Sequence, residues 1–507
     1  MSLHWPANAD SASAWAHQTW SDLAARPDKA RVLVILPVHG FADHGFGLPL
    51  NTEEIVGSAL LRSAVAASGL ATQILVLPPF TFGAAPYAHT HFGTDTDTAL
   101  DALGELLSSI KASGFTRILL FNTSPWNTEI TGTAALDARS ALDLRTYVIG
   151  SSGLGLGFHP EDPKRARTQA VAALLFGREP SPTATLADVR DTDFRPGFYA
   201  HPHPVTSDPY LDGERLFNEA ATQLAGLLQE ISAHGSELPP ATRLSSVPRH
   251  SLLASCPGTT RLLTALTTEE LAALPDKARA LVILPTGAIE QHGHHLPVGT
   301  DTLLGRLWLA HALPKLPADA PVYVAPALVY GKSNEHLGFA GTLTISARTL
   351  RRQLLAQAAH LKALGFRQLA VLNTHGGNSA ILVATLREIQ TTLGLRAGML
   401  SGYYRPQLSP QETAFGFHAG EWETSLLLAG APELVRMDRA VCEYPARIDA
   451  PGVLRPEASA AVFAWKTTDI SRSGVMGDAT QATAEKGARW LDEASAALTR
   501  KIETLLG

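Results

Sequence analysis

The segment PDKARALVILP (Pro275–Pro285) decides how this chain of 507 residues is organised, because PDKARVLVILP (Pro27–Pro37) repeats it with a single difference. The two copies begin 248 residues apart, at 275 and 27. In each copy the apolar run Leu-Val-Ile-Leu-Pro is typical of a short buried strand. A repeat at this distance, in a chain too long for one ordinary domain, predicts two domains of similar fold in tandem.

The repeat continues beyond this segment. Three later phrases pair with earlier ones: AIEQHGHHLPVGTDT (Ala288–Thr302) with GFADHGFGLPLNTEE (Gly40–Glu54), LNTHGGN (Leu372–Asn378) with FNTSPWN (Phe121–Asn127), and GFHAGE (Gly416–Glu421) with GFHPED (Gly157–Asp162). The spacing grows to 251 and then 259, as small loop insertions would produce. We therefore expect a first domain over 1–240, a Pro- and Ser-containing linker over 241–259, and a second domain over 260–507.

Short apolar runs alternate with longer amphipathic runs in each copy. In the second copy Ala280–Pro285, Val322–Leu328 and Gln368–Thr374 resemble buried strands, and Arg348–Gly365 has leucines at helical spacing and a terminal glycine. This alternation predicts an α/β fold with a mostly parallel sheet. Functional groups in such sheets gather beyond the carboxyl ends of the strands, where TGAIEQHG and THGGN both lie.

Composition excludes several classes of protein. The chain is 45% hydrophobic and 17% charged, with a net charge of −6, so it has no basic surplus for nucleic acid. No apolar run is long enough to predict a membrane span. Its two cysteines, Cys256 and Cys442, exclude a disulfide framework and a Cys-rich metal site. The first residues resemble no signal peptide, so we expect a cytoplasmic protein.

The phrase around Glu290 carries side chains that bind metals. Glu290 and His292 are two residues apart, so in an extended segment they leave the chain on the same side. The following glycines and proline can turn the chain and bring Asp301 back to the same place, and His375 supplies another nitrogen. Such a mixed set suits Zn²⁺, Mn²⁺ or Fe²⁺, and an aspartate between two ions can bridge them.

A third cluster, HAGEWETS, follows later in the chain. His418 is expected on a loop, where it suits a general acid or base. Glu423 is expected in the first turn of a helix, as the last metal ligand or as a support for one. We place His295, His336 and Tyr404 as possible substrate-pocket residues, with ordinary packing as the alternative for the two histidines.

In this order, LPTGAIEQHGHHLPVGTDT, SNEHLGFAGT (Ser333–Thr342), NTHGGN and HAGEWETS resemble the creatininase (creatinine amidohydrolase) family. The resemblance covers the second half closely and the first half faintly. It implies two tandem α/β/α sandwich domains, assembly into homo-oligomers, and metal-dependent hydrolysis of non-peptide C–N bonds in cyclic amides or formamides. It also implies that Glu290, His292, Asp301 and His375 bind metal, that Asp301 bridges, and that His418 and Glu423 are catalytic.

One departure from the family pattern bears on the substrate. Family members that act on creatinine carry GHYEN where this chain has THGGN, so Gly377 stands where a glutamate ligand would be. Creatinine is therefore disfavoured, and we expect Glu423 to act as the replacement ligand of the second ion.

The first copy has lost most of these side chains. Its counterparts of Glu290, Asp301, His375 and Glu423 are Ala42, Glu53, Ser124 and Lys164, while His44 and His159 keep the histidines of His292 and His418. A divalent ion would be held weakly by so few ligands. We therefore expect a non-catalytic first domain that packs against the second as in a pseudo-dimer.

The hypothesis is a metal-dependent amidohydrolase with two divalent ions per chain. A metal-activated hydroxide would attack the carbonyl of a small amide substrate, and His418 would protonate the departing nitrogen. The alternatives are a peptidase or lactamase in a biosynthetic pathway, or a non-enzymatic metal-binding scaffold. GLGLG (Gly153–Gly157) is a weak signal for a nucleotide, because we expect no strand directly before it.

Overall fold

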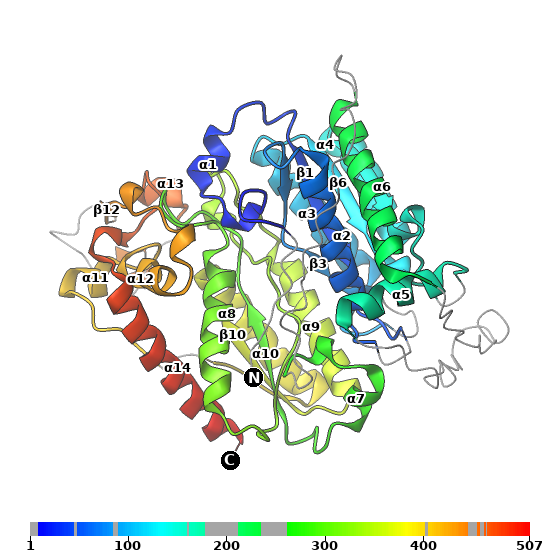
Figure 1. The fold of residues 1–507 in the computed structure, drawn as a ribbon. Coiled ribbons are helices and arrows are strands. Elements are labelled where there is room, and N and C mark those ends of the chain that lie inside the picture. Colours follow the sequence, from blue (N-terminus) through cyan, green and yellow to red (C-terminus); the bar gives the residue numbers. More distant parts are fainter. Residues whose placement is uncertain are drawn as a thin grey trace.

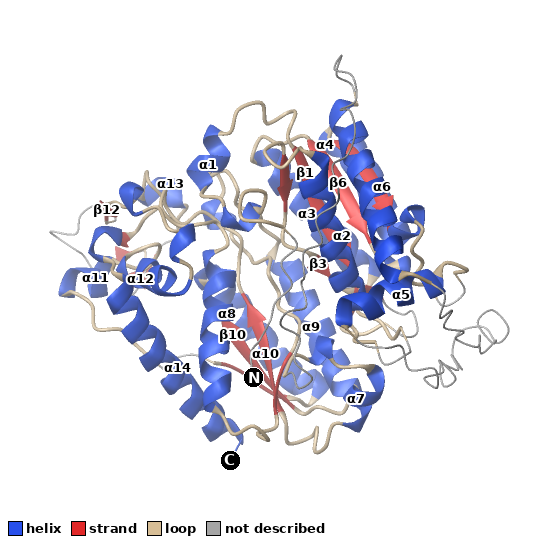
Figure 2. Cartoon of the chain, viewed as in Figure 1, coloured by secondary structure: helices blue, strands red, loops and turns tan. Residues whose placement is uncertain are grey.

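The computed structural model describes residues 9–44, 48–84, 90–159, 162–177, 211–234, 261–400, 404–444, 454–456, 461–462 and 464–506. The expected linker over 241–259 lies outside these residues. The described chain forms two α/β units that lie against each other (Figures 1 and 2).

Each half is built on a parallel sheet with the same strand order. The first sheet runs β2 (Ile74–Val76), β1 (Leu33–His39), β6 (Arg117–Asn122) and β7 (Arg145–Gly150), with β3 (Phe80–Thr81) also paired to β1. The second runs β9 (Val322–Val324), β8 (Leu281–Thr286), β10 (Gln368–Asn373) and β11 (Arg396–Met399). The predicted α/β fold with mostly parallel sheets is confirmed.

Two sequence expectations about strands need correction. The run over 322–328 stops being a strand at Val324, because Pro326 has no N–H for the ladder, although Leu328 still bridges Thr286. A strand, β7, does end at Gly150, shortly before GLGLG. The chain then enters a 3-10 turn at Ser151–Leu154 and not a long helix, so the dinucleotide-binding arrangement is not formed there.

Helices cover both faces of each sheet. In the first half one face carries α2 (Thr52–Ser68), α5 (Arg165–Phe176) and α6 (Gly213–Ala233), and the other carries α3 (Thr96–Ala112) and α4 (Thr128–Leu142). In the second half the corresponding sets are α8 (Thr300–Ala312), α12 (Glu421–Gly430) and α14 (Ala484–Leu506), then α9 (Ala347–Ala363) and α10 (Ser379–Glu388). Successive residues of β1 enter different cores, Leu33 on one side and Val34 on the other, which makes each half an α/β/α sandwich.

The remaining elements are short. They are α1 (Trp20–Ala25), α7 (Thr268–Ala273), α11 (Pro410–Phe415), α13 (Thr467–Ile470), β4 (Gly83–Ala84), β5 (Gly93–Thr94), β12 (Cys442–Glu443), β13 (Leu454–Arg455), β14 (Ala461–Val462) and β15 (Gly477–Asp478), with several 3-10 turns and a π-helical turn at Ile389–Leu393. Among the described helices, none combines the length and apolar character that crossing a membrane requires.

The two halves pack around an approximate twofold relation. One hydrophobic core contains residues of both inner faces, and α3 contacts α9 across the junction. Backbone hydrogen bonds repeat with the spacing of the sequence repeat: Val298 N–H donates to Gln18 O (2.8 Å) and Gly299 N–H to Ala16 O (2.9 Å), while Leu50 N–H donates to Leu266 O (3.0 Å) and Asn51 N–H to Thr264 O (2.8 Å). Each half thus offers its partner the same surface, as the two subunits of a symmetric dimer do.

Candidate metal centre

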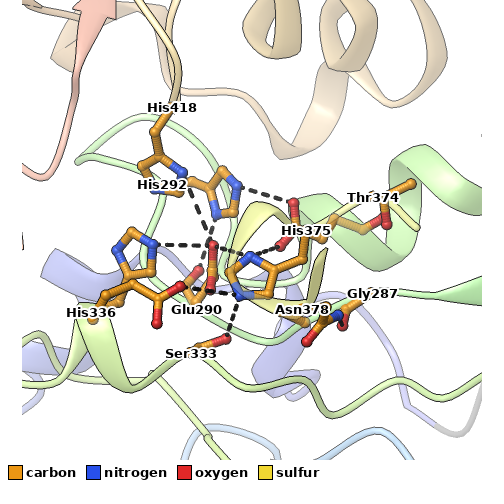
Figure 3. A network of polar contacts seen from close by, with 12 residues as sticks. Gly287, Glu290, His292, Ser333, His336, Thr374, His375, Asn378 and His418 are labelled. Carbon is orange, nitrogen blue, oxygen red and sulfur yellow. Dashed lines mark hydrogen bonds and ion pairs between the residues drawn. The ribbon is translucent and has the colours of Figure 1, made fainter. Parts of the chain in front are cut away.

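The side chains that could hold a metal lie at the carboxyl ends of the two central strands of the second sheet. Glu290 and His292 come from the loop after β8, Asp301 from the first turn of α8, and His375 from the loop after β10. Figure 3 shows His375, His336 and His418 turned toward the Glu290 carboxylate from different elements, whereas His292 Nε2 lies beside Asp301. The tertiary structure therefore brings together four of the five residues that the sequence offered as ligands, and the fifth, Glu423, lies beside His292.

The distances divide these groups into two sets that share Asp301. His375 Nδ1 lies 3.1 Å from Glu290 Oε1 and 3.6 Å from Asp301 Oδ2. His292 Nε2 lies 3.4 Å from Asp301 Oδ1 and 4.0 Å from Glu423 Oε2. The two oxygens of Asp301 thus face different imidazoles, which is the arrangement that a bridging carboxylate requires.

The rings of His292 and His375 are each held by the nitrogen that faces away from the carboxylates. His292 Nδ1 lies 3.1 Å from the carbonyl oxygen of Glu290, and His375 Nε2 lies 2.9 Å from that of Lys332. Each ring can donate to this carbonyl, so His292 Nε2 and His375 Nδ1, which face the carboxylates, would be the nitrogens available to a bound metal. Histidine ligands of metals are usually oriented in this way.

Several polar atoms here are buried without a hydrogen bond. They are both carboxylate oxygens of Glu290, His292 Nε2 and Asp301 Oδ2, on residues no more than 1% exposed. Such groups are costly to bury unless something satisfies them. Divalent cations in the two donor sets would satisfy these atoms, and the mixed oxygen and nitrogen donors fit zinc, manganese or iron.

The electrostatics of the cluster favour positive charge between its carboxylates. Burial alone would lower the pKa of His292, but the charges of Asp301 and Glu423 outweigh it and raise the pKa to about 9. Burial likewise opposes the rise of the His375 pKa to about 10, which Glu290 causes. The neighbouring imidazoles overcome the burial of Glu290 and hold its pKa well below its usual range. The carboxylate of Glu290 is therefore ionised although it is fully buried.

Glu423 lies in the first turn of α12, as predicted, and is the most open acidic group of the cluster. Its side chain is 22% exposed, and it accepts a hydrogen bond from Ala419 N–H (2.6 Å). Burial raises its pKa to about 7, against the opposing charge of His292. Glu423 therefore stands on the His292 side of Asp301, at the place where a second ion would take an oxygen ligand.

His418 lies beside the cluster with one nitrogen directed into it. Its Nε2 is 2.9 Å from the carbonyl oxygen of Gln291, and its Nδ1 is 3.9 Å from Glu290 Oε1. Burial lowers the pKa of His418 well below its usual value, so the ring is neutral at pH 7. A proton held at Nε2 by this carbonyl leaves Nδ1 free to take up a proton inside the site.

Only one of the three expected pocket residues touches the cluster. His336 Nε2 lies 3.3 Å from Glu290 Oε1, and its Nδ1 is 2.7 Å from Thr467 Oγ1. His295 is fully buried, with its Nε2 2.8 Å from Thr424 Oγ1, because the chain turns at Gly293 (φ +68°). The Tyr404 hydroxyl donates to Glu493 on α14 (2.7 Å). Neither of these two groups points at the carboxylates.

The space that a side chain at Gly377 would need is filled by the carboxylate of Glu335. A Cβ added there would lie 1.9 Å from Glu335 Oε1 and 2.5 Å from His375 Nε2. A side chain at 377 would therefore enter the space behind His375, which Glu335 fills at 3.5 Å from the ring nitrogen. Glycine is required at this position as long as Glu335 lies there.

Sequence reasoning missed Gln291, which connects the parts of the site. Its side chain is fully buried, and its amide nitrogen lies 3.0 Å from His336 Nδ1, 3.1 Å from His418 Nε2 and 3.0 Å from the carbonyl oxygen of Gly474. These partners are 45, 127 and 183 residues away in sequence. The only available signal was its position between two ligands in an extended segment.

The equivalent place in the first half keeps one acid and one imidazole. His44 Nε2 lies 3.5 Å from Glu53 Oε1, and Glu53 accepts a hydrogen bond from Gly40 N–H (2.7 Å). Lys164 donates to the carbonyl oxygen of Ser152 (2.7 Å), and the His159 ring lies 4.9 Å from that of Trp126. Among the described residues, the groups of three side chains placed to hold a metal all lie in the second half.

Glu53 should make the stability of the protein depend on pH. Burial raises its pKa from 4.5 to about 7, although hydrogen bonds from Gly40 and Ser124 oppose the rise. Because its pKa is higher in the folded state, the protonated carboxyl of Glu53 is favoured by folding. Its contribution to the free energy of unfolding is complete below pH 4.5 and is lost as the pH rises through 7. Glu53→Gln stays neutral, so its gain in the free energy of unfolding should be larger at pH 8 than at pH 5 by about 2 kcal/mol. Urea unfolding at both pH values measures this difference, and an equal gain would show that Glu53 does not titrate in this range.

The fold and the site together define a class: an α/β/α protein whose sheet ends carry a carboxylate–imidazole centre suited to divalent metal. The family model for creatininase, described as creatinine amidohydrolase, matches residues 16–228 and again 264–502. The chain therefore belongs to the creatininase family of amidohydrolases, as the sequence motifs indicated, and it carries the family domain twice.

Several curated relatives match about two fifths of the chain. It is 34% identical over 211 residues to the mycofactocin precursor peptide peptidase of Mycolicibacterium smegmatis, covering 41% of this chain and 78% of the relative. It is 32% identical over 201 residues to the creatinine amidohydrolase of Pseudomonas putida, covering 36% and 76%. It is 30% identical over 227 residues to the 3-dehydro-scyllo-inosose hydrolase of Thermotoga maritima, covering 41% and 71%.

Solved structures of creatininases also match one half of the chain. The crystal structure of creatinine amidohydrolase (creatininase) has a TM-score of 0.41 and 26% identity, over 49% of this chain and 98% of that one. A manganese form, titled "Creatininase Mn", has a TM-score of 0.39 and 26% identity, over 48% and 98%.

Proposed function

We propose that the second half hydrolyses an amide C–N bond with the help of two divalent ions. The observation that carries this proposal is the position of Asp301, whose two oxygens face His375 and His292 in separate donor sets. Glu290, Asp301 and His375 would hold one ion, and His292, Asp301 and Glu423 the other. When bound, such ions supply a nucleophile at neutral pH and stabilise negative charge on the carbonyl oxygen.

The protein's own groups would orient the ligands and move the proton. His336 holds the Glu290 carboxylate from one side, and the carbonyl of Lys332 fixes the His375 ring from the other. His418 is neutral and has Nδ1 directed into the site, so it would take the proton of the attacking water and give it to the departing nitrogen. Burial of Glu290, His292, Asp301 and His375 limits the access of bulk water and strengthens these interactions.

The first candidate substrate class is a small non-peptide amide, either cyclic or a formamide. The ligands are almost completely buried, and Glu423 is the most open of them. A compact amide would reach such a buried centre with the smallest displacement of the surrounding side chains.

A peptide is the second candidate, and a specific observation favours it. The relative in Mycolicibacterium smegmatis, 34% identical over 211 residues, is named as a peptidase of a precursor peptide. The same donor set can serve either bond, because the chemistry at the carbonyl is the same. The two candidates therefore differ in which substrates can reach the metal centre, and not in the metal centre itself.

We further propose that the first half is non-catalytic and that the boundary between the domains falls in 241–259. The pair His44 and Glu53 supports this, since one imidazole and one carboxylate hold a divalent ion weakly. The first half would then act as the packing partner of the second. Assembly of the whole chain into a homo-oligomer is part of the same proposal, and a mass measurement in solution tests it.

The test combines metal analysis with a substrate panel. Elemental analysis of the purified chain should give two equivalents of zinc, manganese or iron, and one equivalent would require a simpler scheme. Formamides, lactams, other cyclic amides and short peptides should then be compared by kcat/KM. Turnover of peptides alone would select the second candidate. Tightly bound metal without any turnover across the panel would support a non-enzymatic scaffold instead.

A further inference from the structure

The helix α1 belongs to the first half but packs on the loops that surround the metal centre of the second. Trp20 Nε1 donates to the carbonyl oxygen of Ser473 (3.2 Å). The Trp20 ring lies 4.6 Å from the ring of His294 and 4.9 Å from that of Phe339. Figure 1 shows α1, in blue, lying on the side of the second half near α13.

Further contacts fix this helix in place. Asp22 pairs with Arg439 of the second half at 2.6 Å. Leu23 is fully buried, and a Cβ added at Gly341 would come within 2.4 Å of its side chain. Trp15, just before the helix, donates from Nε1 to the Gly341 carbonyl oxygen (3.1 Å). The helix therefore has one position relative to these loops.

A rigid turn connects Trp20 to the site. Glu443 accepts hydrogen bonds from the backbone N–H groups of Arg472 (2.8 Å) and Ser473 (2.9 Å), which holds the turn in one shape. The next residue, Gly474, accepts the Gln291 amide (3.0 Å) and has φ +88°; a Cβ there would lie 1.8 Å from Gln291 Oε1. Gln291 in turn lies against His418 and His336.

The sequence repeat shows that only one of the two equivalent helices carries the tryptophan that makes this contact. The counterpart of α1 is α7, and both begin with a capping box, Thr19 with Asp22 and Thr267 with Glu270. The residue 248 positions after Trp20 is Thr268. The tryptophan is therefore present only on the helix that packs against the half with the metal ligands. Identical subunits would carry the same residue at both places, whereas a fused chain can differ between them.

We infer that Trp20 is a positioning residue through which the first half holds the catalytic groups of the second. The ring and its N–H fix the 471–474 turn and His294, and the turn fixes the Gln291 amide beside His418. This inference rests on the proposed function for its kinetic consequence. Its structural consequence, a restrained 291–295 loop, does not depend on that function.

The experiment compares Trp20→Thr, which installs the residue of the equivalent helix, with Trp20→Phe and with the matched control Thr268→Val in the full-length chain. Hydrogen exchange should become faster in peptides covering 291–295 and 471–476 in Trp20→Thr and stay unchanged in Thr268→Val. On the best amide of the panel, kcat of Trp20→Thr should fall about tenfold with KM within about twofold, because misplaced catalytic groups lower kcat. The metal content should stay at the wild-type value. Trp20→Phe keeps the ring contacts and loses only the hydrogen bond, so both effects should be smaller.

Unchanged exchange over 291–295 in Trp20→Thr would overturn the inference. So would a rise in KM with kcat preserved. If Trp20→Thr does not fold, Trp20→Phe decides by the same two measurements. Faster exchange in a protein that turns over no amide would uphold the positioning role while contradicting the proposed function, so the two failures are distinguishable.

Discussion

Asp301→Ala should abolish both metal binding and turnover. Asp301 faces an imidazole of each donor set, with Oδ1 3.4 Å from His292 and Oδ2 3.6 Å from His375. Its loss would leave each ion short of a ligand. Changes to partners that merely orient a ligand already cost about 10–100-fold in affinity or activity, so removing a shared ligand should cost more than about 100-fold. Elemental analysis and kcat/KM on the same preparation measure the two losses.

The matched control is Glu53→Ala at the equivalent position of the first half. Glu53 has one imidazole neighbour and belongs to no group of three metal-capable side chains among the described residues. Its removal should leave metal content and kcat/KM close to those of the wild type. If Glu53→Ala were the more damaging change, the assignment of roles to the two halves would be reversed.

His418→Ala should lower kcat by about 10²–10⁴-fold, the usual contribution of a positioned general acid or base, while the metal content stays unchanged. The neutral ring directs Nδ1 into the site at 3.9 Å from Glu290, and Nε2 is tied to the carbonyl of Gln291. The two donor sets proposed for the ions, which share Asp301, do not include this ring. Metal analysis and single-turnover kinetics separate loss of binding from loss of proton transfer.

His159→Ala in the first half provides the control, because His159 keeps the equivalent histidine and lies against Trp126. It should leave kcat unchanged. Loss of metal from His418→Ala would instead make His418 a ligand. The structure allows His418 to be a ligand, because its ring nitrogen lies within 4.8 Å of the ligand atoms of His292 and Glu423.

Much of the fold could be predicted because the sequence contains it twice. The repeat of an apolar strand followed by a polar loop placed β8 and β10 within a residue or two, and α9 was expected from its leucine spacing and the glycine at 365, which has φ +99°. The end of β9 differs from the prediction, because Pro326 has no N–H for the ladder and so ends the strand within the apolar run. The candidate ligands could be predicted as a cluster because side chains at the ends of adjacent parallel strands converge.

The positions of the remaining groups depended on contacts that sequence spacing does not carry. His295 and His336 were equivalent candidates by composition, yet one lies against α12 and the other against Glu290. Tyr404 was assigned to the pocket but reaches α14. Gln291 and Glu335 acquire their importance only from partners far along the chain.

By itself, the sequence determined that the protein is a tandem of two α/β domains and that metal-binding side chains survive in the second, because periodicity, strand order and ligand chemistry are local properties of the chain. Only the tertiary structure decided how the two oxygens of Asp301 are shared, which nitrogen of each histidine faces the cluster, and that a helix of the first half packs on the loops of the second. These depend on side-chain directions and on surfaces that meet only when distant segments pack together, so no pattern within a single segment could have encoded them.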